Sequence, residues 1–157
     1  MHPTVEIRVA DVCADVDSAT TLALLTRAMV ETAAEEWRRG SPPDEIPTAV
    51  LRLASWQAAL TGTLGPLVDP RSGRPRAASV VLDALLARVR PALERSGDLA
   101  RVCSGVNRIL YRGTGAERQR AAAARGDLRD AVSVGLPEGV APPRPVDPPR
   151  VPVARHS

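Results

Sequence analysis

The chain has 157 residues, of which 44% are hydrophobic and 2% are aromatic, so it can bury one core of ordinary size and that core must be aliphatic. The 21 basic and 18 acidic residues are interspersed and leave a net charge of only +3, which argues against a nucleic-acid-binding surface. No apolar run approaches the roughly 20 residues needed to span a membrane, so we expect no membrane partner.

The first predicted element is a strand over residues 4–10, because Val5, Ile7 and Val9 alternate with polar residues. A lone strand cannot satisfy its own backbone N–H and C=O groups, and it needs neighbouring strands. No later segment is a confident partner. The strand is therefore expected to pair with another copy of the chain, or with a sheet that is encoded upstream.

Helices are predicted for most of the remaining chain. The first covers about residues 18–39 with Asp17 as its N-cap, and a second covers 45–61 and ends at Gly62. A turn-rich connector is expected over 62–76. The core face of the first helix is predicted to carry Leu22, Leu25, Met29, Ala33 and Trp37.

Two further helices are predicted over about 79–96 and 98–111, and Pro91 is expected to kink or split the first of them. Thr114 and Glu117 match a capping box, in which the hydroxyl and the carboxylate each satisfy an otherwise unpaired backbone N–H. They open a fifth helix.

A short helix over 128–134 is predicted to close the fold, and the proline-rich residues 136–157 are predicted to form a disordered tail. The fold class expected for the domain, residues 1–135, is α+β and mostly α, with one N-terminal strand followed by about five helices.

Glu6 and Arg8 lie two residues apart on the predicted strand, so their side chains project from the same face, roughly 7 Å apart. A carboxylate can bind Mg²⁺, and a guanidinium can hold a phosphate oxygen. This pair suits a nucleotide-dependent ligase, although a solvent-exposed ion pair of little energetic value is the alternative.

The two cysteines, Cys13 and Cys103, have no metal-ligand spacing and form no disulfide framework, which indicates free thiols in a reducing compartment. Since no signal peptide is apparent, we expect a cytoplasmic protein. Every basic residue is arginine, which fits either a phosphate-binding surface or the codon bias of a GC-rich genome.

Several segments, in order, resemble the type 2 glutamate–cysteine ligase family, also called carboxylate–amine ligases. They include PTVEIRVADVC from Pro3, DVD from Asp15, LVDPRSGRP from Leu67, VRPAL from Val89 and GTGAERQR from Gly113. The resemblance runs over residues 3–135 and covers only the family's C-terminal part.

The resemblance implies ATP-dependent amide formation. A carboxylate, typically the γ-carboxylate of glutamate, attacks the γ-phosphate of ATP, and an amine such as that of cysteine captures the acyl phosphate. It also implies a fold similar to the catalytic fold of glutamine synthetase. By this match Glu6 would be a Mg²⁺ ligand, and Arg8 would be the catalytic residue that contacts the transferring phosphate of ATP.

The same match places Arg112, Arg118 and Arg120 in a motif where they reach phosphate or substrate, or alternatively cap and pair along a helix. Trp56 matches a common family tryptophan, for which we expect a role in core packing. Gln57 and Leu60 are departures, because family members often carry arginine there, and this weakens any substrate contact carried over from that helix.

We therefore expect part of an enzyme, active only when an upstream-encoded chain or another copy completes the sheet. Its substrates would be glutamate and an amine such as cysteine. The alternative is a non-catalytic helical interaction module, or a decayed fragment that binds a related ligase.

Overall fold

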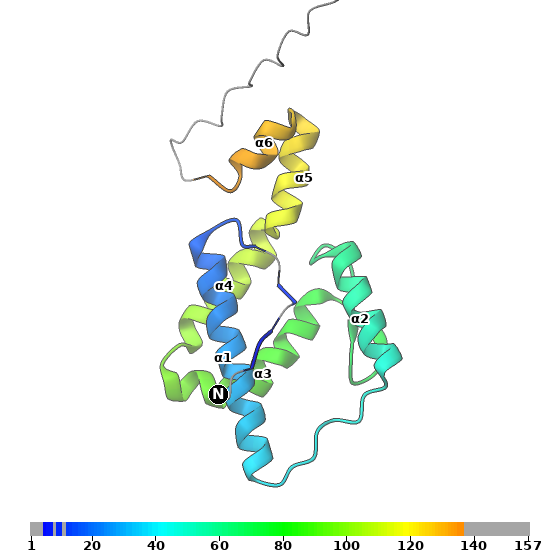
Figure 1. The fold of residues 1–157 in the computed structure, drawn as a ribbon, viewed down its shortest axis with the longest axis vertical. Coiled ribbons are helices and arrows are strands. Elements are labelled where there is room, and N and C mark those ends of the chain that lie inside the picture. Colours follow the sequence, from blue (N-terminus) through cyan, green and yellow to red (C-terminus); the bar gives the residue numbers. More distant parts are fainter. Residues whose placement is uncertain (1–4, 8, 11, 137–157) are drawn as a thin grey trace, which may run out of the picture.

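The structure, a computed structural model, describes residues 5–7, 9–10 and 12–136 and is mostly helical, as predicted (Figure 1). The predicted tail lies outside these residues, apart from residue 136. The elements found in them are α1 (Val16–Arg38), α2 (Thr48–Thr61), β1 (Leu67–Asp69), β2 (Arg74–Arg76), α3 (Ala78–Ser96), α4 (Leu99–Arg112), α5 (Gly115–Arg125) and α6 (Leu128–Ser133).

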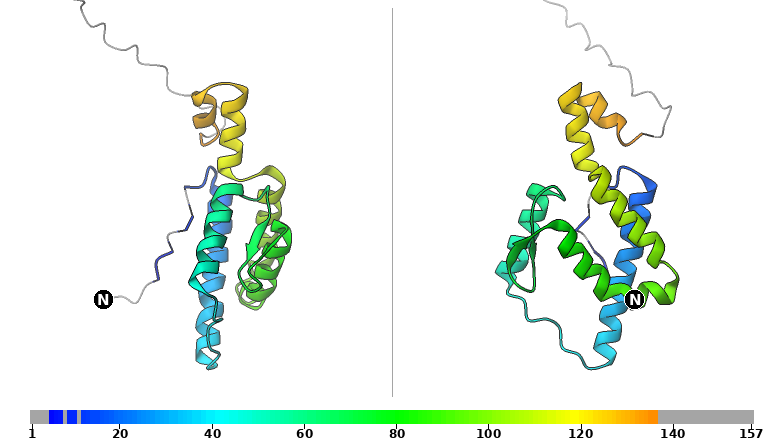
Figure 2. Two further views of the ribbon diagram at one scale, coloured as in Figure 1. Left: turned by 90° about the vertical axis from the view of Figure 1, so that its right-hand side faces the viewer. Right: turned by 180° about the vertical axis from the view of Figure 1, so that it is seen from behind.

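The prediction of an N-terminal strand over residues 4–10 is wrong for the residues of that segment that the structure describes. Residues 5–7 and 9–10 have no regular secondary structure and are exposed. Figure 2 shows the segment running beside the helices rather than between two strands. The physical reason is the one that makes a lone strand unstable: alternating apolar residues form a ladder only when another strand supplies hydrogen bonds.

A short hairpin forms instead in the segment predicted as a turn-rich connector. Strands β1 and β2 pair antiparallel, with Val68 opposite Pro75. The turn is held by Asp69, whose carboxylate accepts hydrogen bonds from the backbone N–H of Arg71 at 3.0 Å and the hydroxyl of Ser72 at 2.7 Å. Because Asp and Ser side chains bond to nearby backbone in this way, the turn was predictable, although the pairing of two three-residue strands was not.

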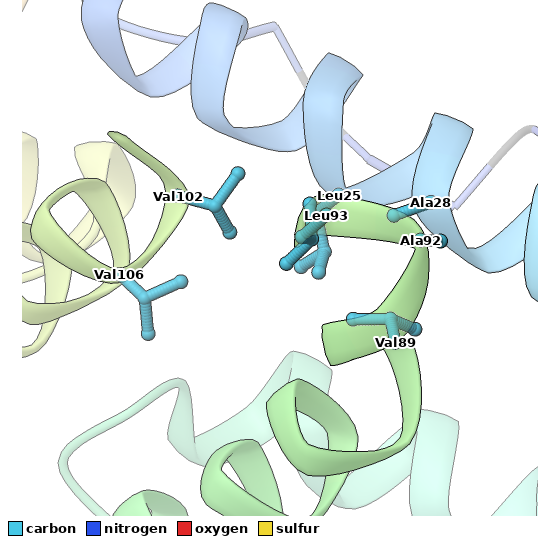
Figure 3. Close-up of a cluster of buried hydrophobic side chains, with 7 residues drawn as sticks. All are labelled: Leu25, Ala28, Val89, Ala92, Leu93, Val102 and Val106. Atoms are coloured by element: carbon cyan, nitrogen blue, oxygen red, sulfur yellow. The ribbon is translucent and has the colours of Figure 1, made fainter. Parts of the chain in front are cut away.

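The core lies between α1, α3 and α4 and is aliphatic, as the composition predicts (Figure 3). Pro91 does not split α3, which continues through it to Ser96. The central side chains of the core are Leu25 and Ala28 from α1, Val89, Ala92 and Leu93 from α3, and Val102 and Val106 from α4.

The face that helix α1 buries agrees with the predicted one at Leu25 and departs from it at Met29, Ala33 and Trp37. Its buried residues are Thr21, Leu25 and Ala28, whereas Met29 is exposed and Trp37 is 79% exposed. The helix begins earlier than expected, since Asp15 rather than Asp17 is the N-cap. Helical spacing identifies an apolar stripe, but the neighbouring helices α3 and α4 decide which part of α1 is covered.

Helix α2 stands apart from this core and packs on β1 (Figure 1). None of its residues is buried, and Trp56, for which we predicted core packing, is 61% exposed. The connector before it is tied to the core helices by Arg88, which donates to Glu36 at 2.8 Å and to Asp44 at 2.7 Å. These two carboxylates raise the pKa of Arg88 above its ordinary value.

The helices of the described residues include none that is both long enough and apolar enough to cross a bilayer.

Helices α1 and α4 are in close contact where Thr21 faces Gly105. A Cβ atom at Gly105 would lie 2.7 Å from the Thr21 Cγ2 atom and 2.9 Å from its Cβ atom. Glycine is otherwise unfavourable inside a helix. Its place in α4 is explained by this contact between the two helices.

We expect Gly105→Ala to lower the free energy of unfolding by about 1–3 kcal/mol, because the added methyl group overpacks the α1–α4 contact. Without that contact, alanine would instead stabilise a helix by about 1 kcal/mol relative to glycine. The sign of the change in the free energy of unfolding therefore shows whether the contact is present. Urea denaturation followed by circular dichroism measures the difference. Thr21→Ala combined with Gly105→Ala should recover part of the loss, and purely additive effects would contradict this explanation.

Candidate anion-binding site at the junction of α4 and α5

The structure does not test the predicted pairing of Glu6 with Arg8. Glu6 is exposed and lies in no strand, and Arg8 lies outside the described residues. Among the described residues no group of three or more His, Cys, Asp or Glu side chains is placed to hold a metal ion. The role of Glu6 as a ligand stays a prediction.

The segment GTGAERQR builds a sharp junction between two helices. Helix α4 ends at Gly113, whose φ of 83° is readily adopted only by glycine. Thr114 then caps α5 as predicted: its hydroxyl accepts from the Glu117 N–H at 3.3 Å, and the Glu117 carboxylate accepts from the Thr114 N–H at 2.7 Å. The confirmed capping box fixes the direction in which α5 leaves α4.

Glu117 also holds the end of α2. Its carboxylate accepts from the backbone N–H of Thr63 at 3.1 Å and from the Thr63 hydroxyl at 3.4 Å. Burial raises the pKa of Glu117, but the hydrogen bonds from Thr114 and Thr63 outweigh it, so the pKa lies below the ordinary value of 4.5. The carboxylate is therefore ionised at neutral pH, and its charge is used in hydrogen bonds within the protein.

Arg118 is anchored to the beginning of α1. Its Nη2 atom donates to Asp15 at 2.8 Å, while the other oxygen of Asp15 accepts from the Ser18 N–H at 2.7 Å. The Ser18 hydrogen bond and the charge of Arg118 together keep the pKa of Asp15 below its ordinary value. The Nε atom of Arg118 is buried and has no hydrogen-bond partner in the described part of the chain.

An open hollow of about 640 Å³ lies beside this junction. Arg112, Arg118 and Arg125 line it, and Glu117 is the one acidic residue among its described lining residues. Arg112 also borders a smaller adjoining hollow, and no ion pair engages it within the described ranges. Because three arginines and one glutamate line it, the hollow carries excess positive charge and suits a carboxylate or phosphate group.

A second hollow, of about 570 Å³, differs in its charge balance. It is lined by Glu31 and Glu35 as well as by Arg38, Arg39 and Arg95. Glu35 forms ion pairs with both Arg39 and Arg95. Because its charges largely neutralise one another, this hollow is a weaker candidate for an anion.

The structure thus brings together two of the three arginines predicted from the C-terminal motif. Arg120 is exposed and does not line the hollow, whereas Arg125, which the sequence analysis missed, does. Arg118 and Arg125 are seven residues apart, so they lie on one face of α5, and that spacing was a signal of a shared site. Arg118 pairs with an acid from α1 rather than along its own helix.

Comparison with known proteins identifies the family of this chain. The sequence profile of glutamate-cysteine ligase family 2 matches residues 1–134, which include every helix and strand described above. The chain belongs to this family. The resemblance seen in the sequence is therefore confirmed.

Curated relatives share nearly half of their matched residues with this chain. A protein of Paenarthrobacter aurescens provisionally named glutamate–cysteine ligase 2-1 is 48% identical over 136 residues, which are 86% of this chain and 35% of the relative. A protein of Streptomyces coelicolor provisionally named glutamate–cysteine ligase 2 is 47% identical over 133 residues, which are 84% of this chain and 37% of the relative. The chain thus spans about a third of these relatives. No solved structure matches it.

We expect Glu117→Gln to reduce the free energy of unfolding at neutral pH by about 1 kcal/mol, the usual value of a capping interaction. Folding lowers the pKa of Glu117. The stabilisation that its ionised carboxylate provides is therefore complete above the ordinary pKa of 4.5, and it is lost as the pH falls through the lower pKa of the folded state. The difference between variant and wild type should shrink in that acidic range.

Urea denaturation at pH values from 3 to about 7 measures this difference. Glu45→Gln, at an exposed position of the connector before α2, is the matched control. A difference for Glu117→Gln that stays constant across the whole range would contradict the role of the ionised carboxylate.

Proposed function

We propose that this chain is the C-terminal part of an ATP-dependent carboxylate–amine ligase that forms an amide bond through an acyl phosphate. Glutamate and an amine such as cysteine are the proposed substrates. The observation that carries the proposal is the uninterrupted family match over residues 1–134. Because the chain spans about a third of its relatives, activity would require the rest of the ligase, from an upstream-encoded chain or another copy.

The contribution of this chain would be to bind an anionic group in the hollow at the α4–α5 junction. The guanidinium groups of Arg112, Arg118 and Arg125 can hold a phosphate of ATP or a substrate carboxylate through paired hydrogen bonds. The unpartnered Nε atom of Arg118 supports this role, since a buried donor left unsatisfied costs about 1–3 kcal/mol and an anion would satisfy it.

In the proposed reaction ATP supplies the phosphoryl group that turns one carboxylate oxygen into a leaving group. The arginines would orient the anion and offset its charge, and such preorganised donors act most strongly where water is excluded. Since Mg²⁺ usually keeps several waters and binds one or two carboxylates together with substrate phosphates, Glu6 would hold it together with the phosphates of ATP.

A non-catalytic interaction module is the second candidate. It is favoured by the absence of a metal-binding cluster from the described residues and by the one-third coverage of the relatives. Such a module would bind a related ligase without contributing to the chemistry.

The enzyme hypothesis is tested by co-expressing the full chain with the part of the Paenarthrobacter aurescens relative that the match does not cover. Phosphate release that depends on ATP, glutamate and cysteine is then measured in the purified complex. Arg112→Ala should lower the rate at least about tenfold, the effect of losing roughly 1.4 kcal/mol of transition-state binding. Arg101→Ala, at an exposed position of the same helix outside the hollow, should leave it unchanged.

Glu6→Gln provides an independent test of the predicted metal ligand. Replacing the carboxylate by an amide removes a charge that Mg²⁺ favours, so we expect lower phosphate release and a higher Mg²⁺ requirement while the complex still forms. An unchanged rate in an active complex would reject the role of Glu6. A stable wild-type complex without any phosphate release would favour the non-catalytic module.

A further inference from the structure

Helix α2 carries an apolar face that nothing in the described part of the chain covers. Ala49, Leu53, Trp56 and Leu60 follow one another at intervals of four, three and four residues, so they form one stripe along the helix. The side chains of Leu53, Trp56 and Leu60 are 45%, 61% and 64% exposed. We call these four residues the α2 stripe.

The α2 stripe is separate from the face by which the helix packs on the hairpin. Val50, Ala54, Gln57 and Thr61 are partly buried and share that packing face. Gln57 donates to the Pro66 carbonyl at 3.2 Å, which anchors α2 to the segment leading into β1. The helix is therefore held in place on one face, while a second face with large apolar side chains remains open to an interaction partner.

We propose that the α2 stripe is the docking surface for the part of the ligase fold that lies outside this chain. The inference rests on the proposed function. The family match runs continuously through α2, yet this chain spans only about a third of its curated relatives. A helix within the family domain therefore exposes a surface typical of an interior contact, and the remaining two thirds of that domain are the partner that fits it.

The distribution of exposed apolar residues favours this partner over a second copy of the chain. Val5 and Val9, on the segment before α1, are 73% and 89% exposed, and Trp37 near the end of α1 is also exposed. Apolar side chains are thus uncovered on several elements. A large domain wrapping around the helices can cover them all, whereas a two-fold dimer covers one self-complementary patch.

The test uses the full chain, tagged and co-expressed with the uncovered part of the Paenarthrobacter aurescens relative. We expect the two to co-purify, and we expect Trp56→Arg and Leu60→Arg each to weaken the complex at least tenfold in a binding titration. Ser55→Arg is the matched control, because this neighbouring residue of α2 is exposed and lies outside the stripe. Circular dichroism of each variant alone verifies that its helices are intact.

Solubility gives a second readout of docking. If the partner fragment becomes soluble only with the wild-type chain or with Ser55→Arg, the proposal is supported. A fragment that binds every variant with the same affinity overturns it, and so does a fragment that stays insoluble even with the wild-type chain. Light scattering of the chain alone overturns it as well if it shows a dimer that Trp56→Arg dissociates. A complex that forms through the stripe but releases no phosphate would reject the proposed function and leave the docking surface standing.

Discussion

Helices α1, α3 and α4 pack around aliphatic side chains, and this core holds the remaining elements in place. Leu93, Val89 and Val102 are almost completely buried, and no aromatic residue takes part in this cluster of the described residues. With small side chains the helices must approach closely to exclude water. Gly105 permits that approach against Thr21, so one residue without a side chain sets the distance between two of the three helices.

This core positions the arginine-lined hollow through the ends of its helices. Helix α1 presents Asp15 at its N-cap, and α4 leads through Gly113 into α5. Arg118 bonds to Asp15, and Glu117 joins the capped end of α5 to Thr63 after α2. Two carboxylates thus hold in place the segments that carry the arginines. The hollow carries excess positive charge because three arginines and one glutamate line it.

The peripheral elements differ from the core in how little of their surface is covered. Helix α2 rests on a three-residue strand, and α5 with α6 projects from one end of the molecule (Figures 1 and 2). The chain belongs to glutamate-cysteine ligase family 2 and spans about a third of its curated relatives. In the proposed ligase these open surfaces would be contacts with the remainder of the domain, and the basic hollow would face the reacting groups.

The features that depend on local interactions could be predicted from the amino-acid sequence. Helical spacing, the Thr114–Glu117 capping box and the aliphatic composition predicted most helices and the nature of the core, because helix hydrogen bonds and caps join residues a few positions apart. Which helix faces are buried could not be predicted, because burial depends on how distant elements pack together. Trp56 and Trp37 were predicted to be covered and are exposed. The described residues before α1 form no strand, because burial and strand pairing both require a partner distant in sequence. The bond between Arg118 and Asp15 joins residues 103 positions apart, and no spacing rule relates them.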